Sequence, residues 1–161
     1  MDSYHVKIAA EAFAAGMFAQ LGCEVSIQYG ADQPEYDLII ARGKKLAKVS
    51  VKGSQDGGWG LSHRYKKGRT YQEAADVWLA RHNEDTIFCL VQFDKVKVGE
   101  APRVYLAKPN EIAAILGTTR KGNGDTVLHE KHIYRTGAGA GSSNAIPDSW
   151  AISEARLAKL L

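Results

Sequence analysis

Residues 36–52 have the sequence YDLIIARGKKLAKVSVK, and this stretch predicts a β-hairpin. Two apolar runs, residues 36–41 and 46–51, are rich in Ile, Leu and Val, which favour strands. The polar segment 42–45 between them contains a glycine and suits a tight turn between antiparallel strands. The stretch is therefore expected to form two neighbouring strands of a sheet.

The predicted hairpin gathers chemically active side chains at one of its ends. Asp37 stands near the start of the first strand and Lys52 near the end of the second, so antiparallel pairing brings the two residues together. Side chains alternate along a strand, so Ser50 and Lys52 share one face and Val51 points to the other. A lysine beside an aspartate at a strand end is suited to position or deprotonate a water molecule near a metal ion.

The rest of the sequence predicts further helices and strands. Helical spacing of apolar residues and capping residues predict helices at residues 3–21, 70–82, 110–116 and 153–161. Further strands are expected at residues 24–28, 86–93 and 103–107, with weak strand signals at 127–128 and 133–134. The glycine-rich segments are expected to be loops, at residues 53–60 and 136–144. This order predicts an α/β fold with a mixed sheet of about five strands, flanked by helices on both faces.

Length and composition exclude several classes of protein. The 161 residues bound the chain to one domain, and 45% hydrophobic with 24% charged residues is an ordinary globular composition. No run of 18 apolar residues exists, so no membrane span is expected. The first residues lack the features of a signal peptide, so a cytoplasmic protein is expected. Cys23 and Cys89 lie in apolar segments and are expected as small buried side chains rather than disulfide or metal ligands.

The charge of the chain is unevenly distributed. The net charge is +3, but residues 42–69 alone carry nine basic residues and one acid, a net charge of +8. Such a window is typical of a protein that binds a polyanion, because each Lys or Arg on a phosphate releases a condensed counterion. The aromatic side chains Trp59 and Tyr65 within it favour nucleic acid, since their rings stack on bases. The alternative is a solvated, lysine-rich surface with no partner.

The first predicted helix carries an acid beside its buried face. Helical spacing predicts a buried stripe made of Val6, Ala10, Phe13, Met17 and Leu21. At 100° per residue, Glu11 lies about 20° from Phe18, on the flank of that stripe. Carboxylates such as those of Glu11 and Asp37 are the hard oxygen ligands that Mg²⁺ prefers.

In order and strand context, these residues resemble the PD-(D/E)xK phosphodiesterase superfamily of restriction-endonuclease-like folds. The pattern of that family is a helix Glu, an Asp at a strand start and an acid-x-Lys on the adjacent strand. Here the matching residues are Glu11, Asp37 within the sequence PEYD of residues 34–37, and Ser50-Val51-Lys52. The resemblance covers about residues 1–107 as a nuclease-like core, and leaves residues 117–161 as a C-terminal extension with a flexible loop at 136–144.

The resemblance implies a Mg²⁺- or Mn²⁺-dependent endonuclease that hydrolyses phosphodiester bonds in DNA. It implies that Asp37, Glu11 and the backbone carbonyl of Val51 bind the metal, that Lys52 orients the attacking water, and that Ser50 holds a metal-bound water or the lysine. It also implies a homodimer, since enzymes of this size cut two strands as pairs. The side chains expected to hold DNA are Arg42, Lys44, Trp59, Arg64, Lys66, Lys67 and Arg69.

One departure from the family pattern leaves other functions open. Ser50 replaces the second acid, and a hydroxyl is a much poorer Mg²⁺ ligand than a carboxylate. A non-catalytic nucleic-acid-binding module on the same fold is therefore one alternative, and an accessory or inhibitor domain that binds an acidic protein is another. Each residue also has a plain structural explanation, with Asp37 following a turn, Lys52 at a solvated strand end and Glu11 on a helix surface.

Overall fold

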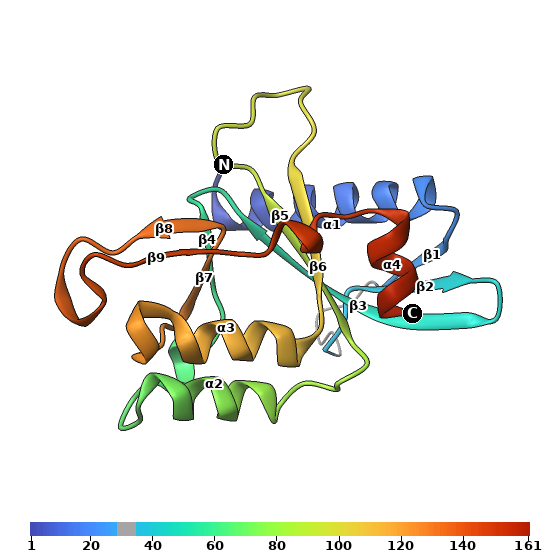
Figure 1. Cartoon of the computed structure of the whole chain (residues 1–161). Helices are drawn as coiled ribbons and strands as arrows, with labels where there is room; N and C mark the ends of the chain where they lie inside the picture. The colour runs from blue at the N-terminus through green and yellow to red at the C-terminus, as the bar shows by residue number, and fades with distance from the viewer. Residues whose placement is uncertain (29–34) are drawn as a thin grey trace.

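The computed structural model describes residues 1–28 and 35–161, and it shows an α/β fold built on one five-stranded sheet. The strand order is β1-β2-β3-β5-β6 (Figure 1). The bounds of these strands are Glu24–Ile27 for β1, Leu38–Arg42 for β2, Lys45–Ser54 for β3, Ile87–Gln92 for β5 and Arg103–Ala107 for β6. β3 and β5 are parallel and the other neighbours are antiparallel, so the predicted mixed sheet of five strands is confirmed.

The predicted hairpin is present as β2 and β3. Leu38 lies opposite Val49, and Arg42 opposite Lys45, so two residues form the turn. Gly43 opens this turn with a φ of 63°, a left-handed value that glycine adopts without a steric penalty. The hairpin turn lies at one end of the molecule in Figure 1, and the start of α2 (Tyr71–Leu79) lies at the opposite end.

Helices cover both faces of the sheet, as the sequence predicts (Figure 1). α1 (Ser3–Gln20) and α4 (Glu154–Leu160) pack on one face, where the core is largely aliphatic. α2 and α3 (Pro109–Gly122) pack on the other face, where the core contains Trp59, Trp78 and Trp150. The capping box at the start of α2 is present, with the Thr70 hydroxyl accepting a hydrogen bond from the Glu73 N–H at 3.1 Å.

The buried face of α1 differs from the predicted stripe. Its buried residues are Val6, Ala10, Ala14 and Phe18. Phe13 is 39% exposed, so its place in the predicted stripe is wrong. The helix is rich in alanine, and apolar residues occur around most of its circumference, so spacing alone does not select one face. The rotation brings Phe18 into the core and leaves Glu11 on its flank.

Gly53 brings α1 and β3 into close contact. A Cβ atom at this position would lie 2.8 Å from Val6 Cγ1 and 2.9 Å from Ala10 Cβ. Only glycine therefore fits where the first turns of the helix cross the strand. The contact fixes the part of α1 that carries Glu11 against the end of β3.

The predicted loop at residues 53–60 is partly wrong. β3 continues to Ser54, and β4 (Gly58–Gly60) pairs with β7 (Val127–His129). Strand propensities miss β4 because two of its three residues are glycine, and its partner lies about seventy residues later in the chain. A second small sheet joins β8 (Lys131–Ile133) to β9 (Ser143–Ala145).

Two other expectations concern the cysteines and membrane spans. Cys23 and Cys89 are free and buried, as predicted. Across residues 1–28 and 35–161, no helix has the length and apolar character that a membrane crossing requires.

Candidate active site

Asp37 is fixed at the point where β3 extends beyond its partner β2. Its N–H donates to the Val49 carbonyl at 2.8 Å, and its Oδ2 accepts a hydrogen bond from the Val51 N–H at 2.7 Å. The carboxylate thus takes the place that a backbone carbonyl of β2 would occupy in a longer strand pair. This hydrogen bond fixes the orientation of the carboxylate against β3.

The backbone carbonyl of Val51 points in the plane of the sheet, toward the side of β3 on which β2 and Asp37 lie. Carbonyls of alternate residues in a strand point to the same side. The Val49 carbonyl accepts from Asp37 on the β2 side, whereas the Ser54 carbonyl accepts from Phe93 on the β5 side at 2.7 Å. The carbonyl of Val51 therefore faces the region beyond the start of β2, next to the carboxylate that its own N–H contacts.

Glu11 reaches this region from α1. Its side chain is 25% exposed, and its Oε1 lies 3.7 Å from the ammonium of Lys7. Burial raises the pKa of Glu11, and the negative charge of Asp37 raises it further, while Lys7 and Lys52 lower it. The charge of Asp37 therefore reaches Glu11, but Glu11 is not among the residues that line the cavity beside Asp37.

Lys52 follows Val51 on β3 and lies close to these charges. Its carbonyl accepts a hydrogen bond from Trp59 Nε1 at 2.9 Å, which fixes the backbone at this point of β3. The side chain is half-buried and projects from the face opposite Val51, which packs in the α1-face core. Its charge lowers the pKa of Glu11 and also that of His82. Lys52 therefore acts on groups on both faces of the sheet.

A cavity of about 490 Å³ opens beside these residues. Its walls come from the start of α1, from Asp37, from the end of β3 and from β4. The residues that line it are Ser3, Val6, Lys7, Asp37, Val51, Lys52, Gly53, Ser54, Gln55, Asp56, Gly58, Trp59, Gly60 and Leu61. The expected grouping of Asp37, Val51 and Lys52 is therefore present at a cavity.

Ser50 does not lie among those lining residues. It is 1% exposed and shares the α2 face with Lys52. Its hydroxyl therefore lies within the protein and does not line the cavity. Among the residues that the structure describes, no group of three or more His, Cys, Asp or Glu side chains could hold a metal ion.

The structure adds a pair that the sequence analysis missed. His82 Nδ1 lies 2.6 Å from Glu35 Oε1, which also accepts a hydrogen bond from the Asn83 N–H at 3.1 Å. Burial lowers the pKa of His82, whose ring packs against Trp78. The pair ties the segment before Asp37 to the end of α2. Glu35 is part of the PEYD sequence, but nothing in the spacing links it to a histidine 47 residues later.

The predicted DNA-binding residues separate into two groups. Arg42 and Lys44 lie at the hairpin end of β3, and Arg42 is 3.7 Å from Glu154. The second group lies beyond the other end of β3, in or after the 3-10 turn that begins at His63, and contains Arg64, Lys66, Lys67 and Arg69. The ten residues of β3 between them span about 33 Å at the usual rise per residue. The predicted DNA contacts therefore form two groups, and Lys45, Lys48 and Lys52 of the same window lie along β3 between them.

Trp59 is placed differently from the other predicted DNA contacts. It lines the cavity, but only 3% of the residue is exposed and its indole N–H is bonded to the Lys52 carbonyl. A ring that packs in the α2-face core has no open face for a base. Its observed role is to hold β3 and β4 together.

No protein-family model, curated protein or solved structure matches the chain.

Proposed function

We propose that this chain is a metal-dependent phosphodiesterase that hydrolyses DNA, with Mg²⁺ or Mn²⁺ as its cofactor, on a restriction-endonuclease-like core. The observation that carries the proposal is the carboxylate of Asp37, bonded to the Val51 N–H at 2.7 Å beside Lys52 and a cavity. Glu11 lies close enough for its pKa to be raised by the charge of Asp37. A carboxylate beside a lysine at an open cavity, with a second acid nearby on α1, is suited to phosphodiester hydrolysis.

Asp37 and Glu11, with the Val51 carbonyl, are the groups that would hold the cation. Burial and the charge of Asp37 raise the pKa of Glu11, which Lys7 and Lys52 offset only in part, so a cation there would favour the ionised form of Glu11. All three are hard oxygen donors, the kind that Mg²⁺ and Mn²⁺ favour. A cation bound there supplies Lewis-acid stabilisation of the phosphate oxygens.

Lys52 provides the chemistry that the carboxylates lack. Its ammonium orients the attacking water by hydrogen bonding and offsets negative charge that develops on the phosphate in the transition state. The hydrogen bond from Trp59 to the Lys52 carbonyl keeps this side chain at the cavity. Ser50, buried on the same face, supports the position of Lys52 and does not itself contact substrate.

We assign DNA as the substrate from the positive charge around the candidate site. The two basic groups at the ends of β3 lie on either side of the candidate site, and each can contact phosphates of one long polyanion. A second copy of the chain would be needed to cut the opposite strand of a duplex at the same place.

The test is cleavage of plasmid DNA with Mg²⁺ or Mn²⁺ by the wild type, Asp37→Asn, Lys52→Met and Lys48→Met. Asparagine keeps an oxygen that accepts the Val51 N–H, and Lys48 is an exposed lysine on the same face of the same strand as Lys52. We expect Asp37→Asn and Lys52→Met each to lose about 10²–10³-fold in rate. The Lys48→Met control should stay near the wild-type rate. Equal cleavage by all four proteins would overturn the proposal.

The second candidate function is a non-catalytic nucleic-acid-binding module. The observation in its favour is Ser50, which stands where the family pattern has an acid and is buried away from the cavity. This candidate predicts salt-dependent DNA binding, with no cleavage in either cation and no stabilisation of the fold by Mg²⁺ or Mn²⁺.

A further inference from the structure

A second cavity, of about 680 Å³, lies where α2 begins and α3 ends. Three cationic side chains from two distant segments line it, namely Lys66, Arg69 and Arg120. The Lys66 ammonium lies 4.5 Å from the centroid of the Tyr71 ring, and the Arg120 guanidinium lies 5.0 Å from the same ring. We call these four residues the Tyr71 cluster.

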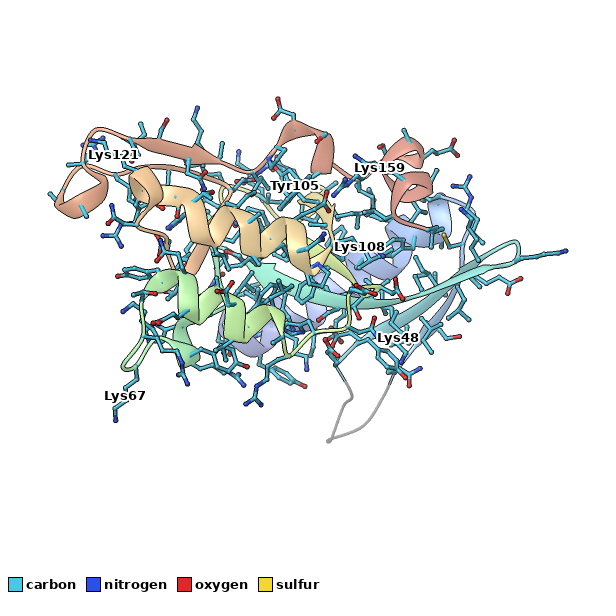
Figure 2. The ribbon with its side chains drawn as sticks, turned by 60° about the horizontal axis from the view of Figure 1, so that its bottom comes forward. Lys48, Lys67, Tyr105, Lys108, Lys121 and Lys159 are labelled. Atoms are coloured by element: carbon cyan, nitrogen blue, oxygen red, sulfur yellow. The ribbon has the colours of Figure 1, made fainter. Side chains whose placement is uncertain are left out.

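The Tyr71 cluster has three cations, and the nearby carboxylates of Glu73 and Asp125 offset only part of their charge. Within residues 1–28 and 35–161, none of its three cations forms an ion pair with an acid. Glu73 also lines the cavity, but its carboxylate is engaged by the Thr70 N–H at 2.7 Å in the capping box. Lys67 extends from the neighbouring loop into solvent at the same end of the molecule (Figure 2).

The fold holds Arg120 in an unusual conformation to reach this cavity. Arg120 has φ 55° and ψ 47°, and the next residue, Lys121, has φ 59° and ψ 37°. Side-chain-bearing residues rarely adopt this left-handed region, and such strain concentrates at functional positions. Arg120 also packs closely on Gly139, where an added Cβ would lie 2.9 Å from Arg120 Cβ. The packing of Arg120 on Gly139 therefore holds this arginine in place, although its backbone is strained and Lys66 lies over the same ring.

We propose that the Tyr71 cluster binds the phosphate backbone of duplex DNA without contacting the bases. This inference rests on the proposed function, since it assigns the surface that holds the same substrate. Arginine and lysine side chains around an open cavity match phosphate oxygens. Two cations already lie over the Tyr71 ring, so the ring holds charges in place rather than stacking on a base.

The cluster is also connected to the candidate active site. Leu61 lines the first cavity and Lys66 lines the second, and one 3-10 turn, His63–Tyr65, joins them. The Leu61 N–H donates to the Thr126 carbonyl at 3.0 Å, which anchors this connection. DNA that reaches Asp37 therefore has a basic surface on the side of the molecule where α2 begins.

The test compares two triple variants with equal loss of charge. One is Lys66→Gln/Arg69→Gln/Arg120→Gln, and the control removes Lys97, Lys131 and Lys159, exposed lysines outside the cluster. Fluorescence anisotropy measures binding of an A·T-rich and a G·C-rich duplex of equal length at several salt concentrations, in EDTA to prevent cleavage. The slope of log affinity against log salt should fall by up to about 2.7 in the cluster variant, about 0.9 for each phosphate that the variant no longer neutralises. It should fall equally for both duplexes and stay near the wild-type value in the control.

Several outcomes would overturn the inference. These are equal slopes in the cluster and control variants, a loss confined to one duplex, or no affinity of the wild type for either duplex at low salt. If the triple variant does not fold, the exposed Arg69→Gln variant alone should lower the slope by about 0.9. Cluster-dependent binding without cleavage in Mg²⁺ or Mn²⁺ would overturn the proposed hydrolysis and leave the cluster assignment intact. Cleavage of DNA, together with equal salt slopes in the cluster and control variants, would overturn the cluster assignment and leave the proposed hydrolysis intact.

Discussion

The two ends of β3 differ in how their backbone is used. At the hairpin end, β3 pairs residue by residue with β2, from Lys45 opposite Arg42 to Val49 opposite Leu38. At the other end β3 runs past the first residue of β2, and the Val51 N–H is taken by the side chain of Asp37. The first end is regularly paired and has Glu154 of α4 beside Arg42, whereas the second meets α1 and the cavity lined by Asp37 and Lys52.

This difference shows where a sheet can support chemistry. In a fully paired stretch, neighbouring strands consume the backbone N–H and C=O groups. Where one strand extends past its partner, these groups become available to side chains and ligands, and here they orient Asp37 and the Val51 carbonyl. The site end should therefore be sensitive to substitution in both stability and activity, and the hairpin end should be sensitive in neither.

The largest expected effect is on stability at the site end. Trp59→Ala removes a buried ring and the hydrogen bond to the Lys52 carbonyl, and should lower the free energy of unfolding by about 3–5 kcal/mol. Leu46→Ala at the hairpin end is the matched control, because Leu46 is 66% exposed and should change stability by less than about 0.5 kcal/mol. Urea denaturation of the two variants measures both values.

The same variant distinguishes packing from base stacking at Trp59. If the ring only packs, DNA affinity per folded molecule and the salt slope should equal those of the wild type. A stable Trp59→Ala protein with affinity weaker by about 1–3 kcal/mol would instead identify the ring as a stacking platform and contradict its buried position.

The second effect concerns the charge of Glu11 and is expected to depend on pH and on divalent cations. Burial and the charge of Asp37 raise the pKa of Glu11 in the folded state. The folded state therefore binds the proton more tightly than the unfolded state, and stability falls as pH rises from the ordinary glutamate pKa of 4.5 through the raised pKa. Glu11→Gln should abolish this loss, which thermal melts at pH 4 and pH 7.5 would detect.

Addition of Mg²⁺ or Mn²⁺ should restore stability to the wild type. At a cation concentration a hundredfold above Kd, the gain is about 2.7 kcal/mol. Glu11→Gln should show a smaller gain, whereas Glu24→Gln, at an exposed position of β1, should respond like the wild type. If the Glu11→Gln and Glu24→Gln variants gain the same stability from Mg²⁺ or Mn²⁺ at both pH values, Glu11 belongs to no cation site.

Local sequence signals predicted the sheet well because they depend on neighbouring residues. The hairpin follows from two apolar runs around Gly43, and the start of α2 follows from Thr70 and Glu73. The extension of β3 through Gly53 was missed because it depends on Val6 and Ala10, more than forty residues earlier in the chain. Strand propensity carries no information about such a contact.

The candidate site was predictable to the same extent. Antiparallel pairing places Asp37 and Lys52 at the same cavity, whereas Glu11, chosen from its place on the helix, does not line it. Ser50 was expected at the cavity, but alternation along β3 cannot tell a cavity-lining position from a buried one. Arg120 joins Tyr71 through a left-handed turn at the end of α3, which no helix signal encodes.

The smallest expected effect is at the hairpin end. Lys44→Gln/Lys45→Gln removes two exposed cations from the turn and should change stability by less than about 1 kcal/mol, because exposed charges contribute little. Their contribution to DNA binding is limited to phosphate contacts, so the salt slope should fall by at most about 1.8, against about 2.7 for the Tyr71 cluster.

A slope that does not change at all would confine DNA to the side of β3 where α2 begins, because β3 holds the hairpin turn about 33 Å away from that side. A slope that falls by the full amount would mean that one duplex spans both ends and crosses the cavity between them. Titrations of a short duplex and a long one decide the matter, since only the longer duplex can reach both ends of β3 at once.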